Sequence, residues 1–323
     1  MRVLVPRSRV HTTAVVFEEP HRLALRPVAV VEPGPADVVV GVEWTGISTG
    51  TERLLLTGQM PPFPGLGYPL VPGYEAVGRI TAAGPESGRQ VGQRVFVPGA
   101  RCFPEVRCLF GGAAAALVVP GARAIPIADG IGADGALLAL AATAYHALAL
   151  PNARPPELIV GHGALGRLLA RIAVALHPEH PVPVVWEKAA VRAGGAAGYQ
   201  VLTPEEDPRK DYQAIIDVSG DSRLLDALIG RLGPGGEVVL AGFYERIGFD
   251  FVPAFLREAT IRVSAEWQPN DLAAVVEQVN AGRVRLKGII SHHVPAAAAS
   301  DAYQVAFSDP GCVKMILDWQ EAA

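Results

Sequence analysis

The chain has 323 residues, half of them apolar, and its 28 basic and 32 acidic side chains give a formal net charge of −4. This length allows two domains of ordinary size, and the balanced charge without a basic block argues against a nucleic-acid-binding surface. No uninterrupted apolar run reaches the roughly 18 to 20 residues of a membrane-spanning helix. Met1–Arg7 lacks the apolar stretch and cleavage site of an export signal, and three cysteines cannot form a disulfide framework. We therefore expect a cytoplasmic protein.

Residues 13–123 have the pattern of a β-rich domain. Short β-branched or aromatic runs alternate with proline and glycine turns, and examples are Thr13–Phe17, Asp37–Val42 and Arg94–Val97. Such punctuation predicts a compact, barrel-like domain. The proline-rich stretch Gly58–Gly73 is expected to be a constrained loop, a common place for a site on a rigid scaffold. A helical pattern follows from about residue 134 to residue 148.

The pattern G-x-G-x-x-G follows the apolar run Leu158–Val160 and precedes an apolar helical pattern. A strand that turns tightly into a helix in this way leaves backbone amides free to bind a phosphate. Gly161 permits the turn, Gly163 leaves room for a pyrophosphate, and Gly166 lets the helix pack closely on the strand. The predicted phosphate-binding residues are Gly161, Gly163, Ala164, Leu165 and Gly166. Three glycines can also fall into this register by chance in a chain with 35 of them.

A carboxylate follows the next predicted strand. Glu187 ends the run Pro183–Trp186, about 20 residues beyond Gly166, where a second parallel strand delivers an acid to the adenosine ribose hydroxyls. A carboxylate there binds the ribose of NAD and repels the additional phosphate of NADP. The nearby cations Lys188 and Arg192 keep NADP possible as the cofactor. The alternative interpretation of Glu187 is a solvated glutamate in a loop. We predict NAD, with Glu187 and Lys188 among the cofactor-binding residues.

Strands and helices continue to alternate after this acid. The runs Ala214–Val218 and Glu237–Leu240 are predicted to be buried strands, and Leu224–Leu232 a helix, so we expect a parallel sheet. A ligand that lies across such a sheet contacts the residues just past the strand ends. Here these residues are Ser219, Gly220, Gly242 and Phe243. Each of them could equally belong to an ordinary turn.

The C-terminal section, from about Trp267, carries one amphipathic helix at Asp271–Asn280 and a few short strands. Its run Gly288–Ser291 is predicted to be a strand. That strand would end at His292 and His293, which we expect at the surface or in an interface.

Four segments of the chain form a known pattern: Gly46–Glu52, Val71–Gly78, Thr143–Leu148 and the glycine turn. Together they resemble the medium-chain dehydrogenase/reductase superfamily, and the resemblance covers nearly the whole chain. It implies an α/β fold with three parts: a GroES-like β-rich catalytic domain at residues 1–125, a Rossmann doubly wound parallel sheet that binds NAD at 126–266, and a return to the catalytic domain at 267–323. It also implies that Thr143 faces the nicotinamide. His146 lies either beside the cofactor or packed in the core.

Longer stretches match at Ser48–Leu55, Met60–Gly65, Gly67–Glu75 and Gly242–Tyr244. They resemble a dehydrogenase family of bacteriochlorophyll biosynthesis. This implies NAD-dependent oxidation of the 3-(1-hydroxyethyl) group of a magnesium-containing chlorin or bacteriochlorin to a 3-acetyl group. Such a tetrapyrrole is broad and apolar, so we expect a wide cleft lined by aromatic and aliphatic side chains. It also allows loose contact with a membrane surface, although no basic amphipathic helix supports such contact.

Many alcohol-oxidising members of the superfamily bind a catalytic zinc through a cysteine before a Gly-Thr-Asp/Glu segment and a histidine before the glutamate of Gly-His-Glu. In this chain the cysteine position is Ser48 or Thr49. The histidine position is Tyr74, and only Glu75 is retained. Hydroxyl oxygens are poor zinc ligands beside thiolate and imidazole. The four-cysteine structural lobe is missing as well, so we expect no metal.

Without zinc, another group must hold and deprotonate the alcohol. We hypothesise that Tyr74 forms a hydrogen bond with the substrate oxygen and that Glu75 tunes it. Thr51 or Ser48 would relay the proton. A buried carboxylate can act as a base through a raised pKa, and it can equally hold a loop by accepting backbone amides. Catalysis and structure therefore both stay open for Glu75.

Two other functions fit the same residues. A zinc-free quinone or enone reductase of the superfamily shares the missing zinc ligands but commonly uses NADPH, against which Glu187 argues. A non-catalytic dinucleotide-binding protein that carries the pigment or senses redox state belongs to a different class, and a glycine turn alone does not exclude it. The superfamily often dimerises by joining sheet edges, and Ile261–Ser264 is a candidate edge for a homodimer.

Overall fold

The computed structural model describes residues 11–244 and 246–321, and these form two compact units. The first unit contains the described residues up to Leu137 and from Ile290 onward, and the second contains Leu138–Ile289. The expectation about an export signal at Met1–Arg7 concerns residues outside the described part of the chain.

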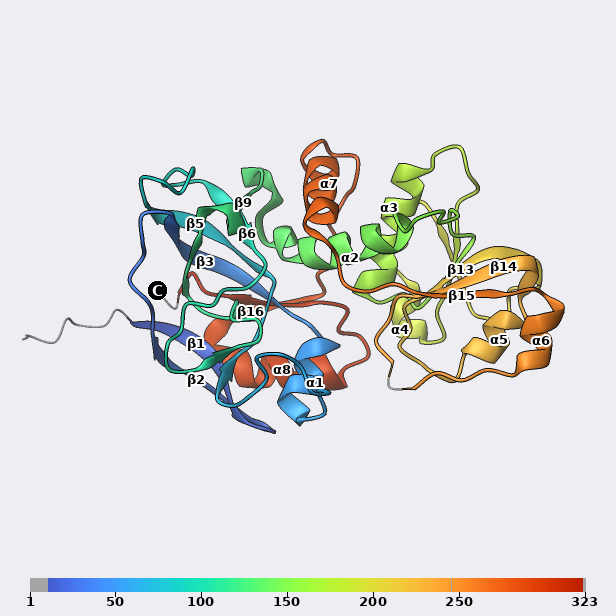
Figure 1. Ribbon diagram of the computed structural model, residues 1–323, viewed down its shortest axis with the longest axis horizontal. Helices are drawn as coiled ribbons and strands as arrows, with labels where there is room; N and C mark the ends of the chain where they lie inside the picture. Colours follow the sequence, from blue (N-terminus) through green and yellow to red (C-terminus); the bar gives the residue numbers. More distant parts are fainter. Residues whose placement is uncertain (1–10, 245, 322–323) are drawn as a thin grey trace, which may run out of the picture. The chain divides into compact units, whose positions relative to one another are not determined.

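Two sheets form the first unit (Figure 1). The four-stranded sheet has the order β2 (Arg22–Ala29), β1 (His11–Glu19), β4 (Leu70–Val71) and β7 (Arg107–Cys108). The seven-stranded sheet has the order β16 (His292–Pro295), β17 (Met315–Asp318), β3 (Asp37–Ile47), β5 (Ala76–Ala83), β6 (Arg94–Val97) and β9 (Ile125–Pro126), with β8 (Ala116–Pro120) paired to β3. The helices are α1 (Thr51–Thr57), α8 (Ala299–Ser308) and the 3-10 turns η1 (Gly121–Arg123), η2 (Asp129–Leu137) and η3 (Ala296–Ala298). Because β17 pairs with β3, the C-terminal segment completes this unit.

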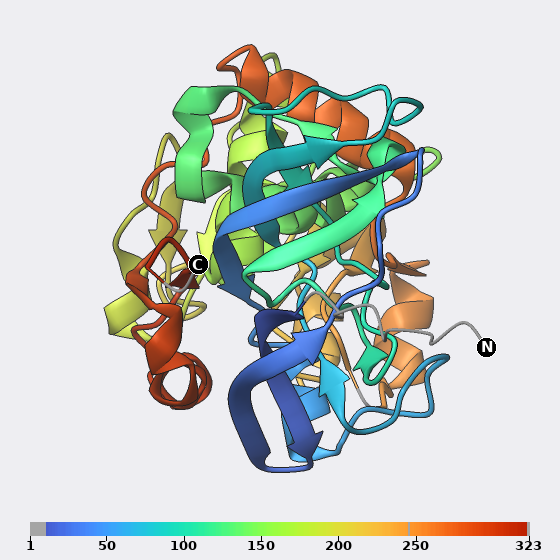
Figure 2. The same ribbon diagram turned by 90° about the vertical axis from the view of Figure 1, so that its left-hand side faces the viewer.

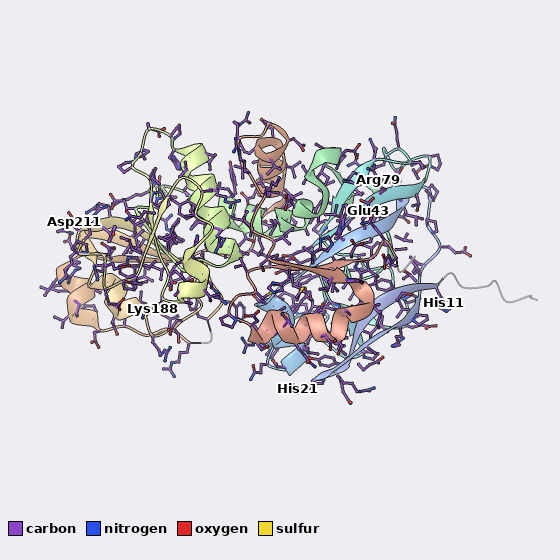
Figure 3. The ribbon with its side chains drawn as sticks, turned by 180° about the vertical axis from the view of Figure 1, so that it is seen from behind. His11, His21, Glu43, Arg79, Lys188 and Asp211 are labelled. Carbon is purple, nitrogen blue, oxygen red and sulfur yellow. The ribbon has the colours of Figure 1, made fainter. Side chains whose placement is uncertain are left out.

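The core of the first unit includes buried residues of both sheets and of α8. The run Ala14–Phe17 in β1 is fully buried, and the ring of Phe17 meets Tyr303 of α8 edge-on with centroids 5.4 Å apart. The hairpin of β1 and β2 is visible in blue in Figure 2. On the larger sheet, neighbouring strands carry the ion pair of Glu43 and Arg79, with 3.4 Å between Oε1 and Nε (Figure 3).

A single parallel sheet forms the centre of the second unit. Its order is β12 (Gln200–Leu202), β11 (Val184–Trp186), β10 (Leu158–Val160), β13 (Tyr212–Asp217), β14 (Leu232–Leu240) and β15 (Thr260–Val263). Its helices are α2 (Leu138–Leu148), α3 (Ala164–Leu176), α4 (Ala190–Ala193), α5 (Leu225–Ile229), α6 (Phe251–Leu256) and α7 (Pro269–Asn280). In Figure 1, α3 lies on one face of the sheet and α5 and α6 lie on the other. The order reverses between β10 and β13, which is where a doubly wound sheet opens a crevice for a ligand.

Most predicted strands are present, but three elements differ from expectation. The helix expected from residue 134 begins only at Leu138, because Asp129–Leu137 forms 3-10 turns. The helix expected at Leu224–Leu232 is confined to α5, since β14 already begins at Leu232. The strand expected at Gly288–Ser291 instead begins at His292, where pairing with β17 starts.

The second unit begins at Leu138 and ends at Ile289. Both boundaries therefore lie further along the chain than the expected domain limits, which were after residues 125 and 266. The 3-10 segment η2 packs against β3 and β5, which keeps it in the first unit, and α7 packs against α2 in the second. Within the described residues, the stretch Asp129–Leu148 has the length and hydropathy of a membrane-crossing helix, and 56% of its apolar window is buried. A core helix passes the same test, and this stretch is interrupted at Gly132 by a non-helical backbone.

Candidate dinucleotide-binding and catalytic sites

The glycine turn joins β10 to α3 in the second unit. Gly161 has a φ of +103°, a left-handed backbone that favours glycine. A Cβ on Gly166 would collide with the carbonyl oxygen of Gly161, whereas a Cβ on Gly163 would meet no atom within 4 Å. Ala164 and Leu165 begin α3, so their backbone amides face the start of the helix with open space beside Gly163. This arrangement fits the diphosphate of a dinucleotide.

His162 ties the glycine turn to the segment after β11. Its buried imidazole lies 2.7 Å, through Nδ1, from the carbonyl oxygen of Arg192 and 2.9 Å, through Nε2, from the hydroxyl of Tyr199. Because a carbonyl only accepts, Nδ1 carries the hydrogen and Nε2 accepts the Tyr199 hydroxyl. Burial lowers the pKa of His162, which favours this neutral form. Arg167 donates to the carbonyl oxygens of His162 and Arg192. No sequence pattern pointed to this role of the side chain.

Glu187 is held beside the glycine turn at the end of β11. Its Oε2 accepts the amide hydrogen of His162 over 3.2 Å, and its Oε1 accepts that of Ala189 over 2.8 Å. These bonds fix the carboxylate at the tip of the strand. Lys188, the next residue, is exposed (Figure 3).

The turn after β13 lies against the glycine turn, and the turn after β14 lies against the turn after β13. A Cβ on Gly161 would come within 3.1 Å of the Cα of Ser219, and a Cβ on Gly242 would come within 3.1 Å of the amide nitrogen of Gly220. Phe243 has a largely exposed side chain. The candidate cofactor residues at the ends of four strands therefore lie together at one edge of the parallel sheet.

Thr143 and His146 lie on α2. The Thr143 hydroxyl donates to the carbonyl oxygen of Ala139 one turn earlier, over 3.1 Å. The Nδ1 atom of His146 is 2.8 Å from Oδ2 of Asp271, which also accepts the amide of Gln268 at the start of α7. His146 therefore has a structural partner that joins α2 to α7. The position of Thr143 relative to a nicotinamide stays a prediction.

In the first unit, Tyr74 contacts the hydroxyls of two residues near the start of α1. Its phenol oxygen is 2.7 Å from Oγ of Ser48 and 3.5 Å from Oγ1 of Thr51. Its ring meets Phe110 edge-on with centroids 5.4 Å apart. Burial, and after it the charge of Glu75, raises the pKa of Tyr74, so the phenol stays protonated at neutral pH. It can accept a proton only while it gives up its own.

Glu75 is buried and paired with Lys314, which directly precedes β17. The Lys314 ammonium donates to Oε2 of Glu75, and neither side chain is more than 2% exposed. The other oxygen, Oε1, has no hydrogen-bond partner among the described residues. Burial raises the pKa of Glu75, and the Lys314 charge opposes the rise. A Cβ on Gly46 would collide with this carboxylate, so the glycine in β3 makes room for it.

Glu52 is a buried carboxylate that the sequence analysis did not select. It accepts the hydroxyl of Tyr303 from α8 and, over 3.1 Å, the amide hydrogen of Ser48. Burial raises the pKa of Glu52 to about 7. Through the Ser48 amide, Glu52 fixes the backbone that carries the hydroxyl next to Tyr74.

The donors at the position of the superfamily's catalytic zinc do not fit that metal. Ser48 and Tyr74 offer hydroxyl oxygens that bond to each other, and Glu75 is engaged by the Lys314 ammonium. Zinc in proteins prefers thiolate and imidazole ligands. Among the described residues, a group of three side chains has metal-binding atoms within 4.8 Å of one another. This group is His177, Glu179 and His180 in the second unit.

The chain matches the alcohol dehydrogenase GroES-like domain family over residues 34–129. It is 53% identical over 318 residues to 2-desacetyl-2-hydroxyethyl bacteriochlorophyllide A dehydrogenase from Cereibacter sphaeroides, an alignment that covers 97% of this chain and 99% of the relative. This chain belongs to that dehydrogenase family. The predicted oxidoreductase class is thereby confirmed.

The fold of this family member is that of solved dehydrogenases. An alcohol dehydrogenase from Escherichia coli CFT073, complexed with NADH, has a TM-score of 0.79 and 20% identity and covers 95% of this chain and 99% of its own. A dehydrogenase from Sinorhizobium meliloti 1021, described as zinc-binding and bound to NADP, has a TM-score of 0.79 and 21% identity. The match covers 96% of this chain and 100% of that chain. The predicted α/β fold class is confirmed. The nicotinamide cofactors belong to those two proteins, and a nicotinamide cofactor stays a prediction for this chain.

Proposed function

We propose that this dehydrogenase oxidises the 3-(1-hydroxyethyl) group of a magnesium-containing chlorophyllide or bacteriochlorophyllide to an acetyl group in bacteriochlorophyll biosynthesis, with NAD as acceptor. The observation that carries the proposal is the 53% identity to a relative whose name states this type of substrate. Two features of the residues support it. The glycine turn has open space beside Gly163 for a dinucleotide, and the hydroxyl cluster of Ser48, Thr51 and Tyr74 can receive a proton.

Oxidation of an alcohol removes a hydride from carbon and a proton from oxygen. A bound nicotinamide supplies the hydride acceptor. The proton leaves through Tyr74, whose phenol oxygen accepts it while its own proton passes to Oγ of Ser48 at 2.7 Å. Ser48 releases its hydroxyl proton in the same relay, so the net result is one proton delivered to water. The half-buried Thr51, at 3.5 Å, offers a second branch toward water. Because Tyr74 stays neutral throughout, this relay needs no phenolate.

In this proposal Glu75 is a positioning residue and the reaction proceeds without zinc. Its Oε2 is bound by Lys314, so the carboxylate acts on Tyr74 through its charge and through the backbone between the two residues. The hydroxyl donors around Tyr74 support catalysis without zinc, because they replace the thiolate and imidazole that zinc prefers.

The direct test of function is the absorption spectrum of the pigment after incubation with the purified protein. We expect the 3-acetyl product when hydroxyethyl bacteriochlorophyllide and NAD are both present. A pigment carrier would retain the pigment with its side chain unoxidised. A quinone or enone reductase would leave the pigment unchanged and would oxidise NADPH when a quinone is added. Either of these results would contradict the proposal.

Glu187 should set the choice of NAD over NADP. Glu187→Gln keeps an amide-accepting oxygen for His162 but removes the charge and one ribose acceptor, so we expect NADH to bind about tenfold more weakly. NADPH binding should strengthen, because repulsion of its phosphate is lost. Nicotinamide fluorescence titrations measure both affinities. Glu258→Gln is the matched control, because Glu258 is an exposed glutamate just before β15, at the opposite end of the parallel strands, and it should leave NADH binding unchanged. Preference of the unmodified protein for NADPH would overturn the assignment.

We infer that the chain forms a homodimer through β15, the last strand of the parallel sheet. Val263 on this strand is 74% exposed, and Phe251 and Phe255 of α6 are also largely exposed. An open strand edge beside apolar side chains is a typical interface. Val263→Asp should convert dimer to monomer in light scattering, whereas Val91→Asp, on a valine of the first unit that is 64% exposed, should not. A monomer that sediments with lipid vesicles would instead assign this face to membrane contact.

A further inference from the structure

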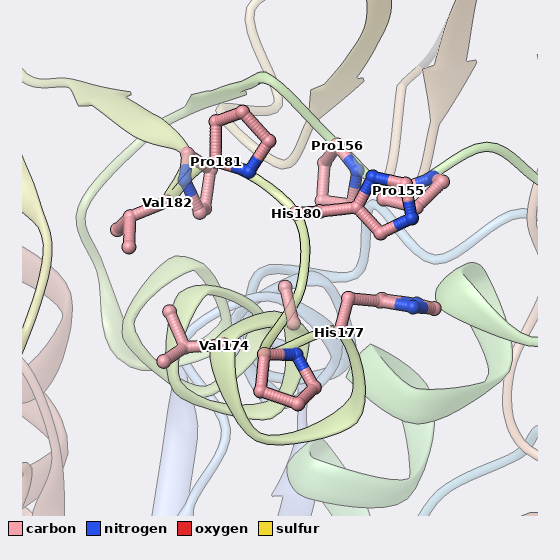
Figure 4. Close-up of a pocket in the computed structure, with 10 residues that line it drawn as sticks. Pro155, Pro156, Val174, His177, His180, Pro181 and Val182 are labelled. Carbon is pink, nitrogen blue, oxygen red and sulfur yellow. The ribbon is translucent and has the colours of Figure 1, made fainter.

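The loop between α3 and β11 carries two histidines and a glutamate outside the sites described above. Its sequence is His177-Pro178-Glu179-His180-Pro181. The amide of His180 donates to the carbonyl oxygen of His177 over 3.0 Å, so the loop turns back on itself. Both imidazoles line a small pocket with Pro155, Pro156 and Val174 (Figure 4).

The turn brings three metal-binding atoms together. One nitrogen of each of His177 and His180 and one carboxylate oxygen of Glu179 all lie within 4.8 Å of one another. The distance from Nε2 of His180 to Oε1 of Glu179 is 3.4 Å. Two zinc bonds of about 2.0–2.1 Å at the tetrahedral angle place their ligand atoms about 3.3 Å apart. Rotamer changes of the side chains are therefore enough to close the site around one ion.

The surroundings favour a cation at this place. Helix α3 ends at Leu176, and its unpaired carbonyl groups give that end a partial negative charge. Pro178 and Pro181 fix the backbone on either side of Glu179 and His180. A restricted loop loses less conformational freedom when it binds an ion. The Glu179 and His180 side chains are 64% and 48% exposed, so an ion can reach them from solvent.

We propose that His177, Glu179 and His180 bind a divalent transition-metal ion of the Zn²⁺ class, with water completing the coordination. Two imidazoles and one carboxylate are ligands that this class of ion prefers over Mg²⁺ and Ca²⁺. Helix α3 has 13 residues, so the site lies about 20 Å along the helix from the glycine turn. The ion fixes the start of the loop that follows α3 and takes no part in hydride transfer.

Calorimetric titration of the metal-stripped, full-length protein with ZnCl₂ tests the site. We expect one ion per chain, a higher thermal midpoint with zinc, and unchanged turnover. His177→Ala/His180→Ala should weaken zinc binding by more than about tenfold and abolish the thermal shift. The matched control is His292→Ala/His293→Ala, a histidine pair on β16 of the first unit. This control should bind zinc as the unmodified protein does.

Cobalt(II) absorption distinguishes this site from the three cysteines of the chain. Nitrogen and oxygen ligands give a tetrahedral cobalt spectrum without the charge-transfer band of a thiolate. The thermal midpoint of the metal-free double variant should match that of the unmodified metal-free protein, which shows that the variant folds. Equal zinc affinity of the double variant and the unmodified protein, a thiolate band, or absence of zinc binding would each overturn the proposal.

Discussion

Tyr74→Phe is expected to lower kcat by about 10²- to 10⁴-fold, the usual contribution of a positioned proton-transfer group. The change removes the only polar atom of the side chain and keeps the ring that packs against Phe110. The Ser48 hydroxyl then loses the partner at 2.7 Å, and the substrate alcohol loses its proton acceptor. Affinity for NADH should stay the same, because the phenol belongs to the first unit and the glycine turn to the second. Stopped-flow reduction of NAD with the pigment alcohol measures the loss.

Tyr68→Phe is the matched control for this result. It removes the same hydroxyl from a neighbouring tyrosine whose oxygen donates to the carbonyl oxygen of Leu55, outside the Tyr74 cluster. We expect kcat within about twofold of the unmodified enzyme, since the cost of losing one such bond falls on stability. The kcat of Ser48→Ala should lie between the kcat values of Tyr74→Phe and Tyr68→Phe, because Thr51 at 3.5 Å from Tyr74 provides a second route for the proton. Normal turnover of Tyr74→Phe would show that the hydroxyl cluster of Ser48, Thr51 and Tyr74 has a structural role and no catalytic one.

The sequence predicts the glycine turn and the parallel sheet of the second unit well, because their signals are local. A strand, three glycines and a helix stand within ten residues of one another, and their spacing alone defines the turn around Gly161. The acid at Glu187 follows from the regular length of a strand-helix-strand unit. The side chain of His162 escaped notice for the opposite reason. Its partners, Arg192 and Tyr199, become neighbours only after the chain folds.

The buried polar cluster of the first unit was predictable only in part. The motif Gly50-Thr51-Glu52 and the pair Tyr74-Glu75 identified the elements, and Glu52 could have been selected from that motif. The partners that determine the charge state of the two buried acids come from the C-terminal segment, 239 residues from Glu75 and 251 residues from Glu52. No local pattern marks a lysine or a tyrosine for such a role. Tertiary pairing, not propensity, decides whether a buried carboxylate is neutral, paired or free.

Lys314→Met should destabilise the protein by about 3–5 kcal/mol at neutral pH, the usual effect of removing one partner of a buried ion pair. Methionine fills much of the lysine volume but leaves Glu75 buried without its counter-charge. Equilibrium unfolding in urea, with both units monitored, measures the loss. The first unit should unfold at lower urea than in the unmodified protein, because both residues belong to it.

The pH dependence of this loss separates lost charge pairing from lost packing. Burial raises the folded-state pKa of Glu75 above its unfolded value, and without Lys314 nothing opposes that rise. A carboxyl group whose pKa is higher in the folded than in the unfolded protein stabilises the folded state while it is protonated. This stabilisation is lost as pH rises through the folded-state pKa. The destabilisation should therefore shrink toward pH 5 and grow toward pH 8. Lys314→Met/Glu75→Leu, which removes both charges, should recover most of the stability with little pH dependence. A double variant as unstable as Lys314→Met would show that packing around Lys314, and not its charge, holds the C-terminal strands to β3.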